Sequence, residues 1–214
     1  MTRASRLKIV NLGLPKTGTT TLARALREAG LFAADHRVRE GDTTDRRVRN
    51  TFVALSLYAG WYEDGDPLGR LTFYDALTEI SALRPPLSLF PQCDYPMLKA
   101  MRDRHPEVKF VATTRPSEDV CESMDNWRDL GRRIADGTIP GLPHGYGADL
   151  SERIHWIEST LQTQRDVFAG RDNFLELDVG AAHAQEQLSD FLGLALPWWG
   201  RENANPKRKR HKVA

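Results

Sequence analysis

The chain has 214 residues, of which 40% are hydrophobic and 28% charged. This composition excludes a wholly disordered protein, and the length is sufficient for one full domain. Its two cysteines, Cys93 and Cys121, are too few for a disulfide framework and lack metal-site spacing, which favours a reducing compartment. No stretch is apolar enough to span a bilayer, and the N-terminal segment lacks the apolar core of a signal peptide. We therefore expect a cytoplasmic protein without a membrane span.

The net charge of +1 conceals a basic C-terminal tail. Residues 207–214, KRKRHKVA, hold five lysines and arginines, and without these five the remaining 25 basic residues face 29 acidic ones. We expect a single domain over residues 1–206, followed by this tail, which is either a solvated terminus or a binder of polyanions. The mildly acidic body argues against nucleic acid as a partner. The sequence gives no indication of the oligomeric state.

The first predicted elements are a strand, a tight loop and a helix. Residues 7–14 form an apolar run that is typical of a buried strand, and it ends at the breaker cluster Gly13-Leu14-Pro15. Apolar residues at positions 22, 25, 26 and 29 have the spacing of one helix face, with Gly30 as the C-terminal cap.

The later elements predict an α/β protein. Residues 31–70 are charged and irregular, and we expect a partly helical variable insertion there. The remaining predictions are strands at 71–78, 108–114 and 173–179, a helix capped by Asp94 with Pro96 in its first turn, helices at 116–127 and 154–168, a loop at 137–147, and a last helix ended by Gly193. Alternating strands and helices favour a three-layer fold with a central, mostly parallel sheet flanked by helices. Ligands of such sheets bind beyond the carboxyl ends of the strands, where the loops 13–20, 78–79 and 114–117 would converge.

The strongest functional pattern is GLPKTGTT at residues 13–20, which we call the phosphate loop. A glycine-rich turn followed by a helix N-terminus directs backbone N–H groups at an anion. The loop differs from the Walker A pattern GxxxxGK[ST] because Thr19 occupies the lysine position, although Gly13, Gly18 and Thr20 match. Its only lysine is Lys16, so an ordinary kinase or ATPase would lack its usual phosphate-binding lysine.

The segment PKTGTT resembles the phosphosulfate loop of the sulfotransferases, which is typically PK[ST]GTT. The resemblance continues in VATTRPSEDVCESMDNW, where Arg115 ends a strand and Ser123 follows eight residues later. It implies that Arg115 and Ser123 bind the 3′-phosphate of 3′-phosphoadenosine 5′-phosphosulfate, the family's sulfuryl donor. The donor residues carried over from the loop are Pro15, Lys16, Thr17, Gly18, Thr19 and Thr20.

A third segment is similar to the family's catalytic region. Leu77-Thr78-Glu79 and the later Leu89-Phe90-Pro91-Gln92 match it, with Glu79 where many members carry a catalytic histidine. Some branches use a glutamate, and FYDALTE is similar to a branch of short bacterial sulfotransferase-like proteins. His36 and Glu40 are rival bases. The chain departs from the pattern at Thr21, where a tryptophan often stacks on adenine, which leaves Trp198 or Trp199 as candidate platforms, and at Leu77, where a lysine is common.

The resemblance implies transfer of a sulfuryl group to a hydroxyl or amine of a small molecule, glycan or lipid, with acceptor choice in residues 31–70 and 131–150. Lys16 would stabilise the leaving phosphate and Glu79 would act as general base. No metal is required. One alternative is a phosphotransferase, for which Asp178 is the only candidate magnesium ligand. Another is a non-catalytic nucleotide-binding protein that interacts through its basic tail.

Overall fold

The computed structural model describes residues 5–84 and 86–200, and the predicted basic tail lies outside these residues. Five strands form the central sheet in the order β2-β3-β1-β6-β7, and all neighbouring pairs are parallel. The strands of this sheet are β1 (Ile9–Asn11), β2 (Ala33–Ala34), β3 (Ala76–Leu77), β6 (Lys109–Thr114) and β7 (Phe174–Asp178). Separately, β4 (Ala82–Arg84) and β5 (Leu87–Leu89) form an antiparallel hairpin.

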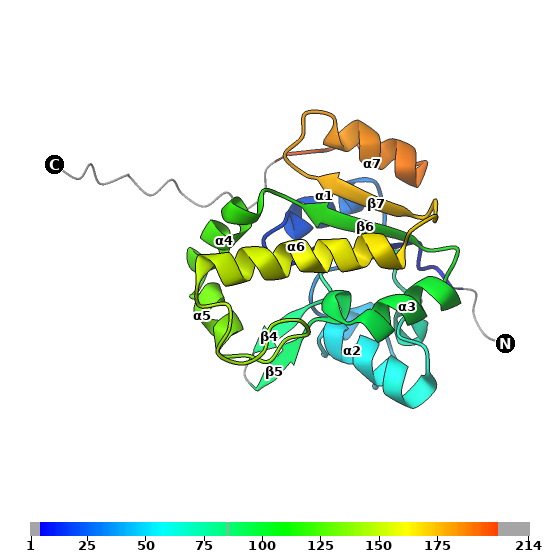
Figure 1. Cartoon of the computed structure of the whole chain (residues 1–214). Coiled ribbons are helices and arrows are strands. Elements are labelled where there is room, and N and C mark those ends of the chain that lie inside the picture. Colours follow the sequence, from blue (N-terminus) through cyan, green and yellow to red (C-terminus); the bar gives the residue numbers. More distant parts are fainter. Residues whose placement is uncertain (1–4, 85, 201–214) are drawn as a thin grey trace.

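Helices cover both faces of the sheet, which confirms the predicted three-layer α/β fold (Figure 1). The α-helices are α1 (Thr19–Glu28), α2 (Val53–Ala59), α3 (Tyr95–Arg104), α4 (Ser117–Asp125), α5 (Leu130–Ala135), α6 (Leu150–Val167) and α7 (Ala184–Leu192). A π-helical turn spans Gly60–Asp64, and 3₁₀ turns span Glu40–Asp42, Gly69–Leu71 and Pro91–Cys93.

The alternation of side chains along the strands builds the two main cores. Val10 and Phe110 face α2, α3 and the end of α6, whereas Ile9 and Val111 face α1 and α7. In Figure 1, α6 lies in front of the sheet and α1 lies behind it. A third apolar cluster joins α4, α5 and the first half of α6 beside the carboxyl ends of the strands. This cluster holds α4 and α5 close to the phosphate loop.

Several predicted elements are shorter in the structure than in the sequence pattern. Of the strand predicted at 71–78, only Ala76–Leu77 joins the sheet, because Tyr74 continues a turn and the Asp75 carboxylate accepts hydrogen bonds from Arg6 and the Phe32 amide. Residues 31–70 are partly helical, as expected, but they also contain the edge strand β2. The hairpin β4–β5 and the helix α5 were not predicted, since their short segments show no clear periodicity.

The helix that Asp94 was predicted to cap is α3. The Asp94 side chain accepts a hydrogen bond from the Met97 amide, and Pro96 occupies the second helical position rather than the first. Of the helices in residues 5–84 and 86–200, none combines the length and apolar character needed to cross a membrane.

Candidate active site

A cavity of about 950 Å³ opens beyond the carboxyl ends of β1, β3 and β6. It is large enough for a nucleotide and a small second ligand. β1 lies between β3 and β6, so the loops that leave these three strands meet at one place. The sequence-predicted site residues that line the cavity are Pro15, Lys16, Gly18, Thr19, Thr20, Glu79, Arg115 and Ser123.

The phosphate loop turns sharply between β1 and α1. Lys16 and Gly18 both have left-handed backbone conformations, with φ of 75° and 106°. A Cβ at Gly18 would approach Val179 Cγ2 to 2.7 Å, so both the conformation and the space require glycine. No described side chain caps α1, and the first-turn residues Thr19 and Thr20 line the cavity. This arrangement presents a helix N-terminus to an anion.

A buried polar network, not predicted from the sequence, holds the phosphate loop against its neighbouring strands. The Asn11 side-chain oxygen accepts hydrogen bonds from the amides of Gly13 (3.0 Å) and Thr113 (3.2 Å), and its amide nitrogen donates to the Thr78 carbonyl (2.9 Å). Asn11 thus connects the three strand ends that frame the cavity. The available signal was a single polar residue inside the apolar run KIVNLGL.

The Thr17 side chain makes its hydrogen bonds within the protein. Its hydroxyl donates to the Leu14 carbonyl at 2.7 Å and lies 2.9 Å from Thr113 Oγ1, and the residue is buried. The side chain is therefore committed to the turn and is not among the residues that line the cavity. Thr17 is thus the one predicted residue of the segment 15–20 that does not line the cavity, and its contact with the donor stays a prediction.

Replacing Gly13 with alanine is expected to destabilise the protein by about 1–3 kcal/mol, the typical cost of inserting an extra group into a packed interior. The added Cβ would lie 2.0 Å from Thr113 Oγ1 and 2.8 Å from the Thr113 carbonyl oxygen, so the loop and β6 would have to separate. Thermal unfolding measures the loss. Gly41→Ala is the matched control, because a Cβ there has no neighbour within 4 Å. Equal melting temperatures of the two variants would contradict this prediction.

Two cations meet at the phosphate loop. Burial lowers the pKa of Lys16, and the nearby charge of Arg115 lowers it further. Arg115 Nη1 donates to the Lys16 carbonyl at 3.2 Å, while its Nη2 lies 3.7 Å from the Asp119 carboxylate. Ser123 reaches the same cavity from α4. Two cations held this close favour a bound anion that carries several negative charges.

Glu79 lies on the cavity wall directly after β3. Its carboxylate accepts hydrogen bonds from the Ser81 amide (3.1 Å) and the Ser81 hydroxyl. Burial raises the pKa of Glu79 to about 7, and the hydrogen bonds from Ser81 and Thr19 only partly oppose this shift. A carboxylate with this pKa is well matched to accept a proton near neutral pH.

The structure separates the two rival bases. His36 lines the cavity, with Nδ1 3.6 Å from the Asp35 carboxylate, whereas Glu40 begins an exposed 3₁₀ turn and is not among the lining residues. The predicted adenine platforms also lie elsewhere. Trp198 stacks against Arg24 of α1 at 4.2 Å, and neither Trp198 nor Trp199 is among the lining residues.

The tryptophan that does line the cavity is Trp127, and Arg84, Arg128 and Arg133 are also among the lining residues. The sequence pattern places Trp127 at the end of the predicted helix 116–127 and indicates no role for the three arginines. They are distant in sequence from the phosphate loop and line the same cavity only in the folded chain. The interval 131–150, expected to influence acceptor choice, reaches the cavity through Arg133.

Asp178, the candidate magnesium ligand of a phosphotransferase, accepts a hydrogen bond from the Gly180 amide at 2.9 Å and does not line the cavity. Across the part of the chain that the structure describes, no group of three or more histidine, cysteine or acidic residues has the arrangement of a metal site.

Comparison with protein families gives the class of this enzyme. The family model described as "Sulfotransferase domain" matches residues 8–131, more than half of the chain, and includes the phosphate loop, Glu79, Arg115 and Ser123. The chain therefore belongs to the sulfotransferase domain family. A comparison with curated proteins found no match.

Proposed function

We propose that this sulfotransferase moves a sulfuryl group from 3′-phosphoadenosine 5′-phosphosulfate to a hydroxyl or amine acceptor. The observation that carries the proposal is the meeting of Lys16, Arg115 and Glu79 in one cavity. They come from three separate segments of the chain, each at the end of a parallel strand. A phosphate-binding loop, a second cation and a base with a raised pKa are the groups that such a transfer requires.

The cavity suits a donor with several phosphate groups. The phosphate loop and the first turn of α1 would hold the 5′ end of the donor, and Arg115 with Ser123 would hold the 3′-phosphate. When bound, the donor supplies the sulfuryl group and a phosphate leaving group. The lowered pKa of Lys16, caused by burial and by Arg115, supports a site in which anionic ligand charge offsets the repulsion between cations.

Within this site, Lys16 would place positive charge where negative charge accumulates on the leaving phosphate. The Glu79 carboxylate would take the proton from the acceptor hydroxyl or amine as the new bond to sulfur forms and the sulfur–oxygen bond to the phosphate breaks. The electron pair of the broken bond remains on the leaving phosphate. His36 is the second candidate for the proton acceptor because it lines the same cavity.

The acceptor is proposed to be a small molecule, a glycan or a lipid. Residues from the variable segment 31–70, including His36 and Phe52, line the cavity together with Arg133. These positions lie outside the phosphate loop and supply acceptor contacts.

The donor site is tested by calorimetric titration with 3′,5′-adenosine bisphosphate. We expect Arg115→Ala to weaken its binding by about 10- to 100-fold, the usual effect of removing a charge-assisted hydrogen bond, and Ser123→Ala to weaken it less. Arg115 also donates a hydrogen bond to the Lys16 carbonyl in the phosphate loop, so Arg115→Ala removes that contact as well. Ser123→Ala leaves this hydrogen bond in place and therefore tests the 3′-phosphate contact separately. Lys99→Ala, an exposed change in α3, is the control for altered net charge.

The alternatives predict different titrations. Binding of ATP with Mg²⁺ but not of the bisphosphate would support a phosphotransferase. Tight bisphosphate binding without sulfuryl transfer to any acceptor would support the non-catalytic nucleotide-binding protein. Bisphosphate affinity that is unchanged in both Arg115→Ala and Ser123→Ala would overturn the proposed 3′-phosphate contacts.

A further inference from the structure

The cavity carries more positive charge than its donor-binding residues explain. Seven lysines and arginines line it against two carboxylates, Asp35 and Glu79, although the whole chain has a net charge of only +1. Positive charge gathered in a cleft concentrates anionic ligands there.

Three of the seven have roles. Lys16 and Arg115 belong to the proposed donor site, and Arg27 donates to the Ala33 carbonyl and lies 3.9 Å from Asp35. Arg37 lies in the variable segment, where it donates to the Asn50 carbonyl. Arg84, Arg128 and Arg133 remain, and no carboxylate among the described residues forms an ion pair with any of them.

Trp127 connects two of these remaining arginines, Arg128 and Arg133, to Lys16. The Lys16 ammonium lies 5.1 Å from the centroid of the Trp127 ring, and the guanidinium carbons of Arg128 and Arg133 lie 5.9 and 5.7 Å from it. The Trp127 side chain is 43% exposed. Three cations around one accessible ring repel one another, and a bound anion removes that repulsion. A ligand anion bound by these arginines would share the cavity with Lys16.

The guanidinium group of Arg133 is held in place before any ligand arrives. Arg133 Nε donates to the Arg128 carbonyl (3.2 Å) and Nη1 donates to the Leu83 carbonyl (3.0 Å), which ties α5 to the hairpin. Arg128 and Asp129 are consecutive non-glycine residues with positive φ, 49° and 52°, a conformation that costs energy and is found most often at functional sites. The fixed guanidinium group of Arg133 loses little entropy on binding an oxyanion.

We propose that the acceptor itself carries an oxyanion, a carboxylate, sulfate or phosphate, which Arg128 and Arg133 bind while Arg84 adds positive charge. This inference rests on the proposed sulfuryl transfer, because it identifies the other half of the same cavity as the acceptor site. The hydroxyl or amine to be modified would then point toward Lys16 and Glu79. Guanidinium groups suit this role because they bind oxyanions through paired N–H donors.

The test measures binding of charged and neutral acceptors to protein saturated with 3′,5′-adenosine bisphosphate. The probes are 4-hydroxyphenylacetate, 3-hydroxybutyrate and glucuronate, each compared by calorimetry with its primary amide. We expect at least one carboxylate to bind about tenfold more tightly than its amide. We expect Arg128→Gln to remove this preference, with affinity for the bisphosphate unchanged.

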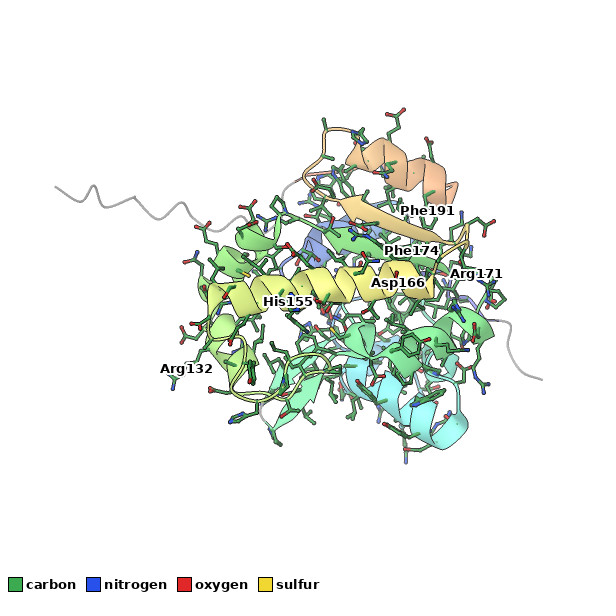
Figure 2. The ribbon with its side chains drawn as sticks, in the orientation of Figure 1. Arg132, His155, Asp166, Arg171, Phe174 and Phe191 are labelled. Atoms are coloured by element: carbon green, nitrogen blue, oxygen red, sulfur yellow. The ribbon has the colours of Figure 1, made fainter. Side chains whose placement is uncertain are left out.

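Arg132→Gln is the matched control. It makes the same change of charge one residue before Arg133, but its side chain is 83% exposed and points away from the molecule beyond α5 (Figure 2). This variant should keep the preference for the carboxylate. Arg128→Gln is chosen over a change at Arg133, because Arg133 also anchors the hairpin.

Three results would overturn the inference. The first is that no carboxylate binds better than its amide although the bisphosphate binds. The second is that the preference for the carboxylate survives Arg128→Gln combined with Arg84→Gln. The third is that Arg128→Gln weakens binding of the bisphosphate instead, which would assign these cations to the donor. A wild-type protein that fails to bind the bisphosphate at all would contradict the proposed function itself, and that failure is visible before any acceptor is added.

Discussion

Lys16→Ala is expected to lower kcat by about 10²- to 10³-fold, the loss seen when a charge-stabilising group is removed from a preorganised site. Lys16 is the only lysine of the phosphate loop, and it faces the cavity beside Arg115. Its positive charge would act mainly on the leaving phosphate in the transition state, so kcat should fall more than affinity for the donor. Initial rates of 3′,5′-adenosine bisphosphate release at saturating donor measure the effect.

The backbone of Lys16 requires a second variant, since its φ of 75° is unfavourable for alanine. Asparagine accepts the left-handed region more readily, so Lys16→Asn removes the charge with less backbone strain. Both variants should show the same loss of kcat, with melting temperatures near that of the wild type. Lys8→Ala, an exposed change outside the cavity, is the control. A kcat that falls less than about threefold in Lys16→Asn would exclude Lys16 as the stabilising charge.

Glu79→Gln is expected to lower kcat by about 10²- to 10⁴-fold, the contribution of a general base. Because burial raises the pKa of Glu79 to about 7, the wild-type rate should rise with pH through about 7 as the carboxylate loses its proton. The glutamine variant should lose this rise together with the rate. The pH dependence of kcat, measured for both proteins between pH 5.5 and 8.5, checks the prediction.

A matched change at His36 distinguishes the two candidate bases. His36→Gln should retain most of the activity and the pH dependence if Glu79 is the base. The reverse pattern, in which His36→Gln is inactive and Glu79→Gln keeps the rise near pH 7, would assign the role to His36. Both residues line the cavity, so either outcome remains compatible with sulfuryl transfer.

The stability of Glu79→Gln provides an independent check. The folded-state pKa of Glu79 lies above the ordinary value of a glutamate, so its contribution to stability is full at low pH and is lost as the pH rises through about 7. At pH 8 the Glu79 carboxylate of the wild-type protein is charged, and the Glu79→Gln variant, which has a neutral amide, should be at least as stable as the wild type. A melting temperature of the variant clearly below that of the wild type at pH 8 would contradict the burial assigned to this carboxyl group.

Much of the fold is readable in short stretches of the sequence. The run that contains Ile9 and Val10 predicts β1, and the periodic apolar residues that follow predict α1 with Gly30 just beyond its end. The strand predicted at 108–114 is present as β6. These elements can be predicted locally, because the apolar runs and the periodic spacing that indicate them lie in neighbouring residues. The two-residue strands β2 and β3 leave no such pattern, since their strand conformation depends on pairing with partners far along the chain.

The candidate site divides in the same way. The phosphate loop was predictable because its glycines, lysine and threonines are consecutive, and Arg115 and Ser123 were identified through the resemblance of their segment to the sulfotransferase pattern. The hydrogen bonds of the Thr17 hydroxyl were not predictable, because its contact with Thr113 forms only in the folded protein, beside its bond to the Leu14 carbonyl. Glu40 was indistinguishable from His36 in the sequence, and only the path of the chain after β2 separates them.

By itself, the sequence determined the α/β alternation, the phosphate loop and the family to which the protein belongs, because each is encoded in contiguous residues. Only the tertiary structure decided that Glu79 is buried enough to have a pKa near 7, and that Asn11 joins three strand ends. It also decided that Trp127, Arg128 and Arg133 share a cavity with Lys16. These properties arise from desolvation and from contacts between distant segments, and both exist only after the chain has folded.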